Sequence, residues 1–143
     1  MTIARLIESR NSNVISCSAA TSVREAIDLL AERRIGALPV LAAGKVAGIF
    51  SERDVIYNLQ AQGAAALDRR VGEVMTARAV TASPDTEVLE ALGLMTRRRI
   101  RHLPVVAANG AMIDFVSIGD LVKYRIELIE SEAEAMRVYI QSA

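Results

Sequence analysis

Apolar residues along this chain follow two spacings, one typical of strands and one typical of helices. Short apolar runs predict strands over residues 14–17, 37–41, 46–50, 79–82, 103–106 and 111–116. Apolar residues three and four apart predict helices over residues 3–9, 22–34, 51–60, 71–75, 88–95 and 120–140. The order strand, helix, strand, strand, helix therefore occurs twice. This order predicts an α/β fold of the α+β type, built from two tandem β-α-β-β-α repeats.

A duplication in the sequence explains this doubling. When the chain is shifted by 65 residues, 21–43 falls on 86–108, and 13 of the 23 positions are identical. Each copy alone would bury a poor fraction of its surface, so we expect the copies to share one core about a pseudo-two-fold axis. The predicted organisation is one module over 1–143, with the first repeat at 10–60, a linker at 61–73, the second repeat at 74–126 and a C-terminal helical extension at 127–143.

A serine and an aspartate three residues apart occur at the same junction in both repeats. Ser51 and Asp54 follow a predicted strand in the first repeat, and Ser117 and Asp120 follow its counterpart in the second. A helix N-terminus offers free N–H groups to an anion, and a carboxylate one turn in suits sugar hydroxyls. The same spacing fits a capping box, although that box favours Glu or Gln at its last position. Ligand contact is the interpretation that we favour, and capping can coexist with it.

The composition narrows the class of protein. The 17 basic and 17 acidic residues give a formal net charge of zero, which argues against a nucleic-acid or membrane-surface role. Hydrophobic residues make up 52% of the chain, yet no apolar run reaches the ~20 residues of a membrane span. The first residues lack the apolar stretch of a signal peptide. Cys17 is the single cysteine, so no intramolecular disulfide can form. We therefore expect a soluble cytoplasmic protein.

Two alternatives to small-molecule binding can be weighed from the residues. The basic run 97–102 could bind nucleic acid, but most of it ends an amphipathic helix, where cations are favoured by the helix dipole. Aromatic residues make up only 3% of the chain, which argues against base-stacking platforms. An enzyme would need a general base or a metal, and the two aspartates are the obvious candidates for a base. His102 is the only histidine, which argues against a zinc site. We expect no enzyme activity and no metal.

Several further motifs resemble those of a known family. Both repeats contain Leu-Pro-Val, and both end in Ser-x-x-Asp. The stretch 71–76, followed by 79–85, is similar to the way a second CBS motif begins, and 100–105 is equally typical. With the β-α-β-β-α order, these motifs make the chain resemble a CBS domain pair, or Bateman module, of the stand-alone bacterial type. The resemblance covers nearly the whole chain.

This resemblance implies a regulatory or sensor module that binds an adenosyl ligand in two clefts between the repeats. The ligand would be AMP, ADP or ATP, with NAD(H) or S-adenosylmethionine as further possibilities, and no catalytic cofactor is implied. By analogy with the family, Asp54 and Asp120 would hold ribose hydroxyls, while Ser51 and Ser117 would contact phosphate beside the helix N-termini. The family also implies a disc-like homodimer.

The resemblance also assigns the base and the outer phosphates. Ile15 and Val80 would flank adenine, and Arg101 and His102 would reach phosphates. The ligand-binding set implied in this way is Ser51, Arg53, Asp54, Ser117, Asp120, Arg101, His102, Ile15, Val80 and Thr81.

The two repeats differ near the expected ligand. The first has Gly36-Ala37 where the second has Arg101-His102, and the second has Asp114 where the first has Gly48. We therefore expect two unequal affinities, with the tighter cleft favouring more phosphate charge. A carboxylate at position 114 would repel phosphate if it faced a cleft.

Overall fold

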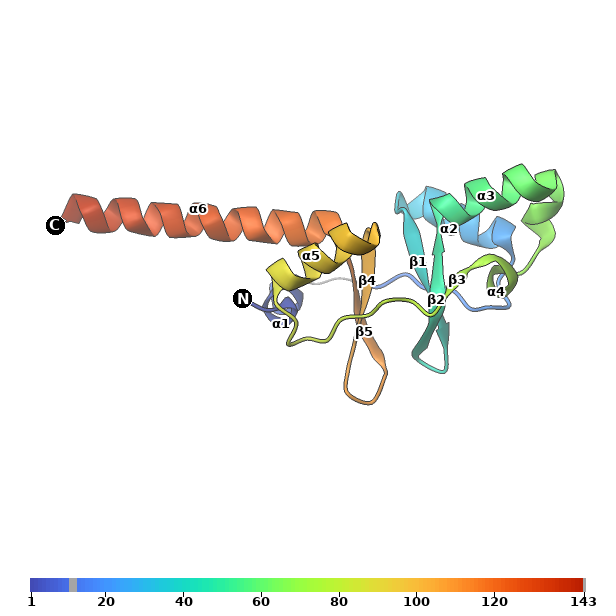
Figure 1. Ribbon diagram of the computed structural model, residues 1–143, viewed down its shortest axis with the longest axis horizontal. Coiled ribbons are helices and arrows are strands. Elements are labelled where there is room, and N and C mark those ends of the chain that lie inside the picture. The colour runs from blue at the N-terminus through green and yellow to red at the C-terminus, as the bar shows by residue number, and fades with distance from the viewer. Residues whose placement is uncertain (11–12, 143) are drawn as a thin grey trace.

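The computed structural model describes residues 1–10 and 13–142. Figure 1 shows two units of similar build along the long axis, with the last helix extending from one end. In chain order the elements are α1 (Ile3–Glu8), α2 (Val23–Arg33), β1 (Ala37–Ala42), β2 (Lys45–Ser51), α3 (Glu52–Gln62), the 3-10 helix η1 (Gly63–Asp68), α4 (Val71–Val74), β3 (Thr76–Ala77), α5 (Val88–Arg98), β4 (His102–Val106), β5 (Met112–Ser117) and α6 (Ile118–Ser142). The predicted α+β class with two tandem repeats is confirmed.

Helix α2 shows how the local sequence sets the ends of these elements. The Ser22 hydroxyl accepts from the Glu25 N–H at 3.1 Å, and the Glu25 carboxylate accepts from the Ser22 N–H at 3.3 Å, and these two bonds make a capping box. The helix ends at Arg34 in the left-handed conformation, with φ 52°. Its counterpart α5 ends in the same way at Arg99, with φ 55°. The repeat thus preserves the C-terminal cap of this helix, whereas the N-cap differs, because Glu87 at the start of α5 makes no side-chain capping hydrogen bond.

Each unit is built around an antiparallel hairpin, β1–β2 in the first and β4–β5 in the second. The strands predicted over 14–17 and 79–82 are wrong. Each of these segments makes a single parallel bridge to a hairpin, from Cys17 to Val40 and from Ala82 to Val105.

A proline at the centre of each outer hairpin strand explains why these ladders stop after one bridge. The Cys17 N–H donates to the Pro39 carbonyl at 3.1 Å, and the Leu41 N–H donates to the Cys17 carbonyl at 2.9 Å. The next bond of a parallel ladder would need the N–H that Pro39 lacks. Pro104 has the same place beside Ala82, whose N–H donates to the Pro104 carbonyl at 2.9 Å.

The short strand β3 makes the two hairpins different, and the sequence pattern did not predict it. It pairs with β2 at Gly48 and Ile49. A Cβ on Gly48 would lie 2.7 Å from the Thr76 carbonyl oxygen, so only glycine permits this approach. In the second hairpin the matching position is Asp114, which is 2% exposed.

Buried side chains form two clusters, one in each unit, in place of the single shared core that we expected. Exchanged helices join the units. Helix α1 inserts Ile3 and Leu6 into the core of the second unit, and the Ile3 N–H donates to the Thr86 carbonyl at 2.9 Å. Helix α4 inserts Val71 into the first core, with its N–H donating to the Thr21 carbonyl at 2.8 Å. Because the helix before each repeat covers the other repeat, the two halves depend on each other.

Helix α6 starts in the second core and then leaves the body of the molecule (Figure 1). Leu121 is fully buried, whereas every residue over 129–142 is exposed. The single long helix predicted for this tail is confirmed. Neither α6 nor any other helix in the described ranges combines the length and the apolar character needed to cross a bilayer.

Candidate functional site

Two clefts between the units are each lined by residues from both repeats. The larger, which we call the Ser51 cleft, has a volume of about 700 Å³ and lies between the N-terminus of α3 and residues 78–80 and 99–102. The smaller, the Ser117 cleft, has a volume of about 230 Å³ and lies between the N-terminus of α6 and residues 13–15. Each cleft therefore sets the Ser-x-x-Asp motif of one repeat against the segment before the first helix of the other.

In the Ser51 cleft the motif forms a capping box at the start of α3. The Ser51 N–H donates to Asp54 Oδ2 at 2.9 Å, and the Asp54 N–H donates to Ser51 Oγ at 3.4 Å. The other carboxylate oxygen, Oδ1, accepts from the Thr76 hydroxyl at 3.2 Å. Asp54 is half-buried at the wall of the cleft. Oδ2 also accepts from the Ser51 hydroxyl at 3.1 Å, so the carboxylate is held in one orientation and Oδ1 is its less engaged oxygen.

In the Ser117 cleft the same box carries an additional partner, Arg10. The Ser117 N–H donates to Asp120 Oδ2 at 2.8 Å, and the Asp120 N–H donates to Ser117 Oγ at 3.0 Å. Arg10 reaches Asp120 Oδ2 with its Nη1 at 2.8 Å and Asp114 Oδ1 with its Nη2 at 3.0 Å. Nη2 also donates to the Phe115 carbonyl at 3.2 Å. One guanidinium thus bridges two carboxylates inside the smaller cleft.

This bridge sets the charge state of the Ser117 cleft. Burial alone would raise the pKa of Asp120, but the hydrogen bonds from Ser117 and Arg10 outweigh it and lower that pKa below its usual value. Burial acts to lower the pKa of Arg10, and its bonds to Asp120 and Asp114 raise it above the usual value. Asp114 lines this cleft, where its carboxylate was expected to repel phosphate. Its carboxylate is paired there with Arg10.

Arg10 is a functional residue that the sequence motifs did not identify, although the repeat contains a signal for it. A shift of 65 residues places Arg10 on Met75. In the first hairpin a Cβ on Gly48 would lie 2.8 Å from the Met75 sulfur, so the apolar side chain packs against glycine. At the second hairpin, the positions that match Met75 and Gly48 are Arg10 and Asp114. A charge at an apolar repeat position, matched by an opposite charge at its neighbour, is a pattern that could have identified the pair.

His102 lies between the two clefts and lines both of them. Its ring stacks on Phe115 with centroids 5.4 Å apart and an angle of 11° between the planes. Burial lowers the pKa of His102, although the nearby Asp120 and Glu52 act in the opposite direction. Gly36, in the counterpart pair Gly36-Ala37, lies beside this ring, and a Cβ added there would meet His102 Cε1 at an ordinary contact distance of 3.6 Å.

Four arginines line the Ser51 cleft, and only two of them, Arg53 and Arg101, were expected from the sequence. Arg78 and Arg99 complete the group. Arg99 belongs to the basic run that is expected to end a helix, and as the left-handed cap of α5 it lines the cleft. The Ser117 cleft contains one arginine, which is already paired with two carboxylates.

The remaining predicted site residues are divided between the clefts. Ile15 lines the Ser117 cleft and Val80 lines the Ser51 cleft, each opposite the motif of the other repeat. Thr81 is exposed and is not among the residues that line either cleft. Over residues 1–10 and 13–142, no group of three His, Cys, Asp or Glu side chains is arranged to hold a metal ion.

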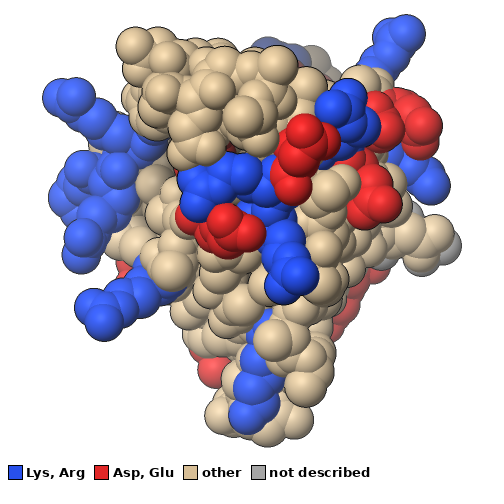
Figure 2. Space-filling view, turned by 90° about the vertical axis from the view of Figure 1, so that its right-hand side faces the viewer, with Lys and Arg blue, Asp and Glu red and all other residues tan. Residues whose placement is uncertain are grey.

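Charges of both signs are mixed on the outer face of the first repeat. Figure 2 views the molecule from the right-hand end of Figure 1 and shows basic side chains next to acidic ones at the centre and upper right, with a group of basic side chains along the left-hand edge. Such a surface does not provide the continuous basic stripe along which a nucleic-acid backbone is usually bound.

Cys17 should react slowly with thiol reagents. Burial raises the pKa of its thiol to about 11, from 9.0. The thiolate is then about 100-fold scarcer at pH 8, and since a more basic thiolate is also more nucleophilic, the net loss in rate is about tenfold. Rates with a chromogenic disulfide, measured on the folded protein and on the protein in denaturant, will check this. Equal rates in the two states would show that burial does not protect the thiol.

Comparison with known proteins places this architecture in a family. The CBS domain profile matches residues 7–61 and again residues 71–127. The chain is 37% identical over 130 residues to the CBS domain-containing protein CBSX3, mitochondrial, of Arabidopsis thaliana, a match that covers 87% of this chain and 63% of that protein. The chain therefore spans less than two thirds of the length of this relative.

Solved structures agree with this match. A CBS-domain containing protein from Agrobacterium tumefaciens superposes with a TM-score of 0.81 at 35% identity, covering 87% of this chain and 99% of that one. CBSX2, solved in complex with AMP, superposes with a TM-score of 0.76 at 25% identity, covering 89% and 97%. The twofold profile match and the shared architecture together show that this chain belongs to the CBS-domain family and carries two CBS domains in tandem.

Proposed function

We propose that this chain is a regulatory module that binds an adenine nucleotide, chiefly in the Ser51 cleft, and passes the signal on through a homodimer. One observation carries the proposal. The oriented Asp54 carboxylate at the N-terminus of α3 and four arginines line one cleft of about 700 Å³. That volume falls within the roughly 300–1,000 Å³ of small-molecule sites.

Each part of a nucleotide has a chemical counterpart in this cleft. Asp54 offers carboxylate oxygens to the ribose hydroxyls, and the first N–H groups of α3 favour a phosphate. Ile49 and Val80 provide apolar surface for the base. Arg101 and Arg53 are exposed at the cleft, where guanidinium groups can bind phosphate oxygens in pairs.

The Ser117 cleft is proposed as the weaker site. It has about a third of the volume of the other cleft, and Asp120 already accepts from Arg10. A ribose hydroxyl there would meet a carboxylate whose charge is already paired with that guanidinium. We therefore expect the Ser51 cleft to bind the nucleotide with the higher affinity and to be the more selective for phosphate.

Two sources support the choice of ligand. The family relative CBSX2 was solved with AMP, and the cleft residues here offer a carboxylate for sugar hydroxyls and cations for phosphate. The proposal assigns no reaction to the chain. ADP, ATP and NAD(H) are members of the same ligand class, and the test compares them directly.

Calorimetric titration with AMP, ADP, ATP and NAD(H) tests this proposal. We expect saturable binding with one dominant site, whose affinity rises with the number of phosphates. Arg101→Ala should weaken that site by about 10- to 100-fold, since it removes a charge-assisted contact. Arg97→Ala is the matched control, because Arg97 is exposed on α5 and lines neither cleft. If none of these nucleotides binds, or if both variants lose affinity equally, the assignment fails. Binding to an oligonucleotide that weakens steeply with salt would favour the nucleic-acid alternative.

A further inference from the structure

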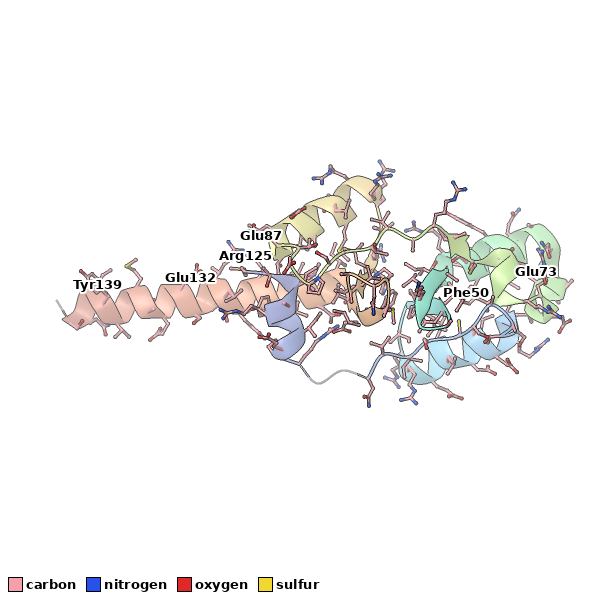
Figure 3. The ribbon with its side chains drawn as sticks, turned by 90° about the horizontal axis from the view of Figure 1, so that it is seen from below. Phe50, Glu73, Glu87, Arg125, Glu132 and Tyr139 are labelled. Carbon is pink, nitrogen blue, oxygen red and sulfur yellow. The ribbon has the colours of Figure 1, made fainter. Side chains whose placement is uncertain are left out.

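Helix α6 presents a stripe of apolar side chains that no other described element covers. Figure 3 shows Glu132 and Tyr139 on the part of α6 that extends beyond α1 and α5. We call the stripe formed by Val122, Ile126, Ile129, Ala133, Met136 and Ile140 the α6 stripe. All six residues are exposed, with Ile126 at 50% and Met136 at 59%. An amphipathic helix normally buries such a face.

The spacing of the α6 stripe identifies the kind of contact that would bury it. Successive members are four, three, four, three and four residues apart. This is the 3.5-residue spacing of a heptad repeat, which a left-handed pair of helices buries between them. The a positions are then Ile126, Ala133 and Ile140, and the d positions are Val122, Ile129 and Met136. The stripe is about 27 Å long at ~1.5 Å per residue.

Charges beside the stripe select the relative direction of two such helices. The flanking e positions are Lys123, Glu130 and Arg137, and the g positions include Arg125 and Glu132. In a parallel, in-register pair each g residue faces the e residue five positions later on the other helix. Arg125 then faces the partner subunit's Glu130, and Glu132 faces the partner subunit's Arg137. Both contacts join opposite charges, and symmetry forms each of them twice.

The antiparallel arrangement that buries the same stripe brings like charges together. There e residues face e residues and g residues face g residues. Glu130 would face the partner subunit's Glu130, and Glu132 would face the partner subunit's Glu132. Lys123 would face the partner subunit's Arg137. The charge pattern thus complements a second copy of this chain in the parallel direction and opposes it in the other.

We propose that α6 pairs with α6 of a second copy as a parallel, in-register two-stranded coiled coil. Its two-fold axis runs along the helix, and hence near the long axis of the molecule (Figure 1). Such an axis places each repeat beside the same repeat of the other copy. Ile56 and Tyr57 of α3, each 63% exposed, then provide apolar surface for contact between the first repeats. This matters because the α6 stripe is shorter than the roughly three to four heptads that normally indicate a coiled coil.

The inference deepens the homodimer part of the proposed function, and it does not depend on nucleotide binding. Disulfide trapping tests it on the full chain. In a Cys17→Ser background, Ala133→Cys should form a covalent dimer on mild oxidation, because a positions meet their own copies in a parallel coil. Ser131→Cys, on the opposite side of α6, is the matched control and should remain uncrosslinked.

Disulfide trapping also detects the antiparallel pair of helices. In the antiparallel pair, position 133 meets position 129, so only a mixture of Ala133→Cys and Ile129→Cys chains would crosslink. The mismatched pairs lie too far apart for the Cα separation of a disulfide, at most about 7 Å. Crosslinking in that mixture alone, or a monomer by light scattering at tens of micromolar, overturns the parallel coil. Nucleotide titration of the same variants shows separately whether the binding proposal stands.

A charge exchange provides a second test that leaves the apolar stripe intact. Glu132→Arg should weaken the dimer by about 3- to 10-fold, because two attractive contacts become repulsive. The double variant Glu132→Arg, Arg137→Glu should recover most of that loss. Sedimentation equilibrium at low salt measures all three dissociation constants. A double variant as weak as the single one would contradict the pairing of positions 132 and 137.

Discussion

Asp54→Ala should weaken nucleotide binding to the Ser51 cleft by at least about 100-fold. A hydrogen bond to a charged acceptor contributes about 1.5 kcal/mol or more, and two ribose hydroxyls would lose such a partner. The combined loss of about 3 kcal/mol corresponds to that change in dissociation constant. Calorimetric titration of the variant with the best nucleotide from the panel measures it. Asp120→Ala should have a smaller effect, because Arg10 already engages that carboxylate.

Asp54→Ala also breaks a capping box, so its effect on folding needs a matched control. Glu25→Ala breaks the same kind of box at α2, and Glu25 lines neither cleft. Both variants remove the N3 partner of the box and should lose about 0.3–1.5 kcal/mol of the free energy of unfolding. Only Asp54→Ala should lose affinity. A comparable loss of affinity in Glu25→Ala would mean that helix stability, and not a contact with ribose, governs binding.

Arg10→Ala should be the most destabilising single change at the clefts. It removes the guanidinium from two carboxylates, one of which, Asp114, is only 2% exposed. Breaking a buried pair costs roughly 3–5 kcal/mol. Because the Arg10 side chain is 24% exposed, we expect about 2–3 kcal/mol, or a fall in Tm of about 5–10 °C. Thermal unfolding without nucleotide at neutral pH measures it.

A surface ion pair of this chain provides the control for Arg10→Ala, and the packing in the first repeat provides a rescue variant. Arg24 pairs with Asp68 at 3.4 Å on the surface, so Arg24→Ala should change stability by less than about 1 kcal/mol. The double variant Arg10→Met, Asp114→Gly copies the Met75–Gly48 packing of the first repeat and should restore most of the loss. If Arg24→Ala costs as much as Arg10→Ala, the bridge has no special role.

The dependence of the free energy of unfolding on pH, at acid pH, tests the bridge between Arg10 and Asp120 independently. The pKa of Asp120 in the folded chain is below its usual 3.8. The unfolded chain therefore takes up the proton first, and the stability that Asp120 contributes is present above pH 3.8 and is lost as the pH falls further. Without Arg10, this part of the dependence should become shallower.

Local pattern accounts well for the elements and for the motifs. The capping box at Ser22, the long tail helix and the two hairpins follow from spacing and turn residues within a few positions of each other. The strands expected over 14–17 and 79–82 failed for a reason also visible in the sequence. Pro39 and Pro104 lie on the neighbouring strands and lack the N–H that a ladder needs. Apolar character predicts that these segments are buried. It does not show whether the neighbouring strand has the backbone N–H groups needed to pair with them.

The sequence by itself determined that this protein is a duplicated α+β module with a Ser-x-x-Asp motif at the start of one helix in each half. Only the tertiary structure decided how the halves combine. It sets each motif against the other repeat, gives Arg78 and Arg99 to one cleft and Arg10 to the other, and leaves the α6 stripe uncovered. The physical reason is that helix periods and caps depend on neighbours along the chain. A cleft and an exposed face depend on which distant segments pack together, and here the exchange of α1 and α4 between the two cores fixes that choice.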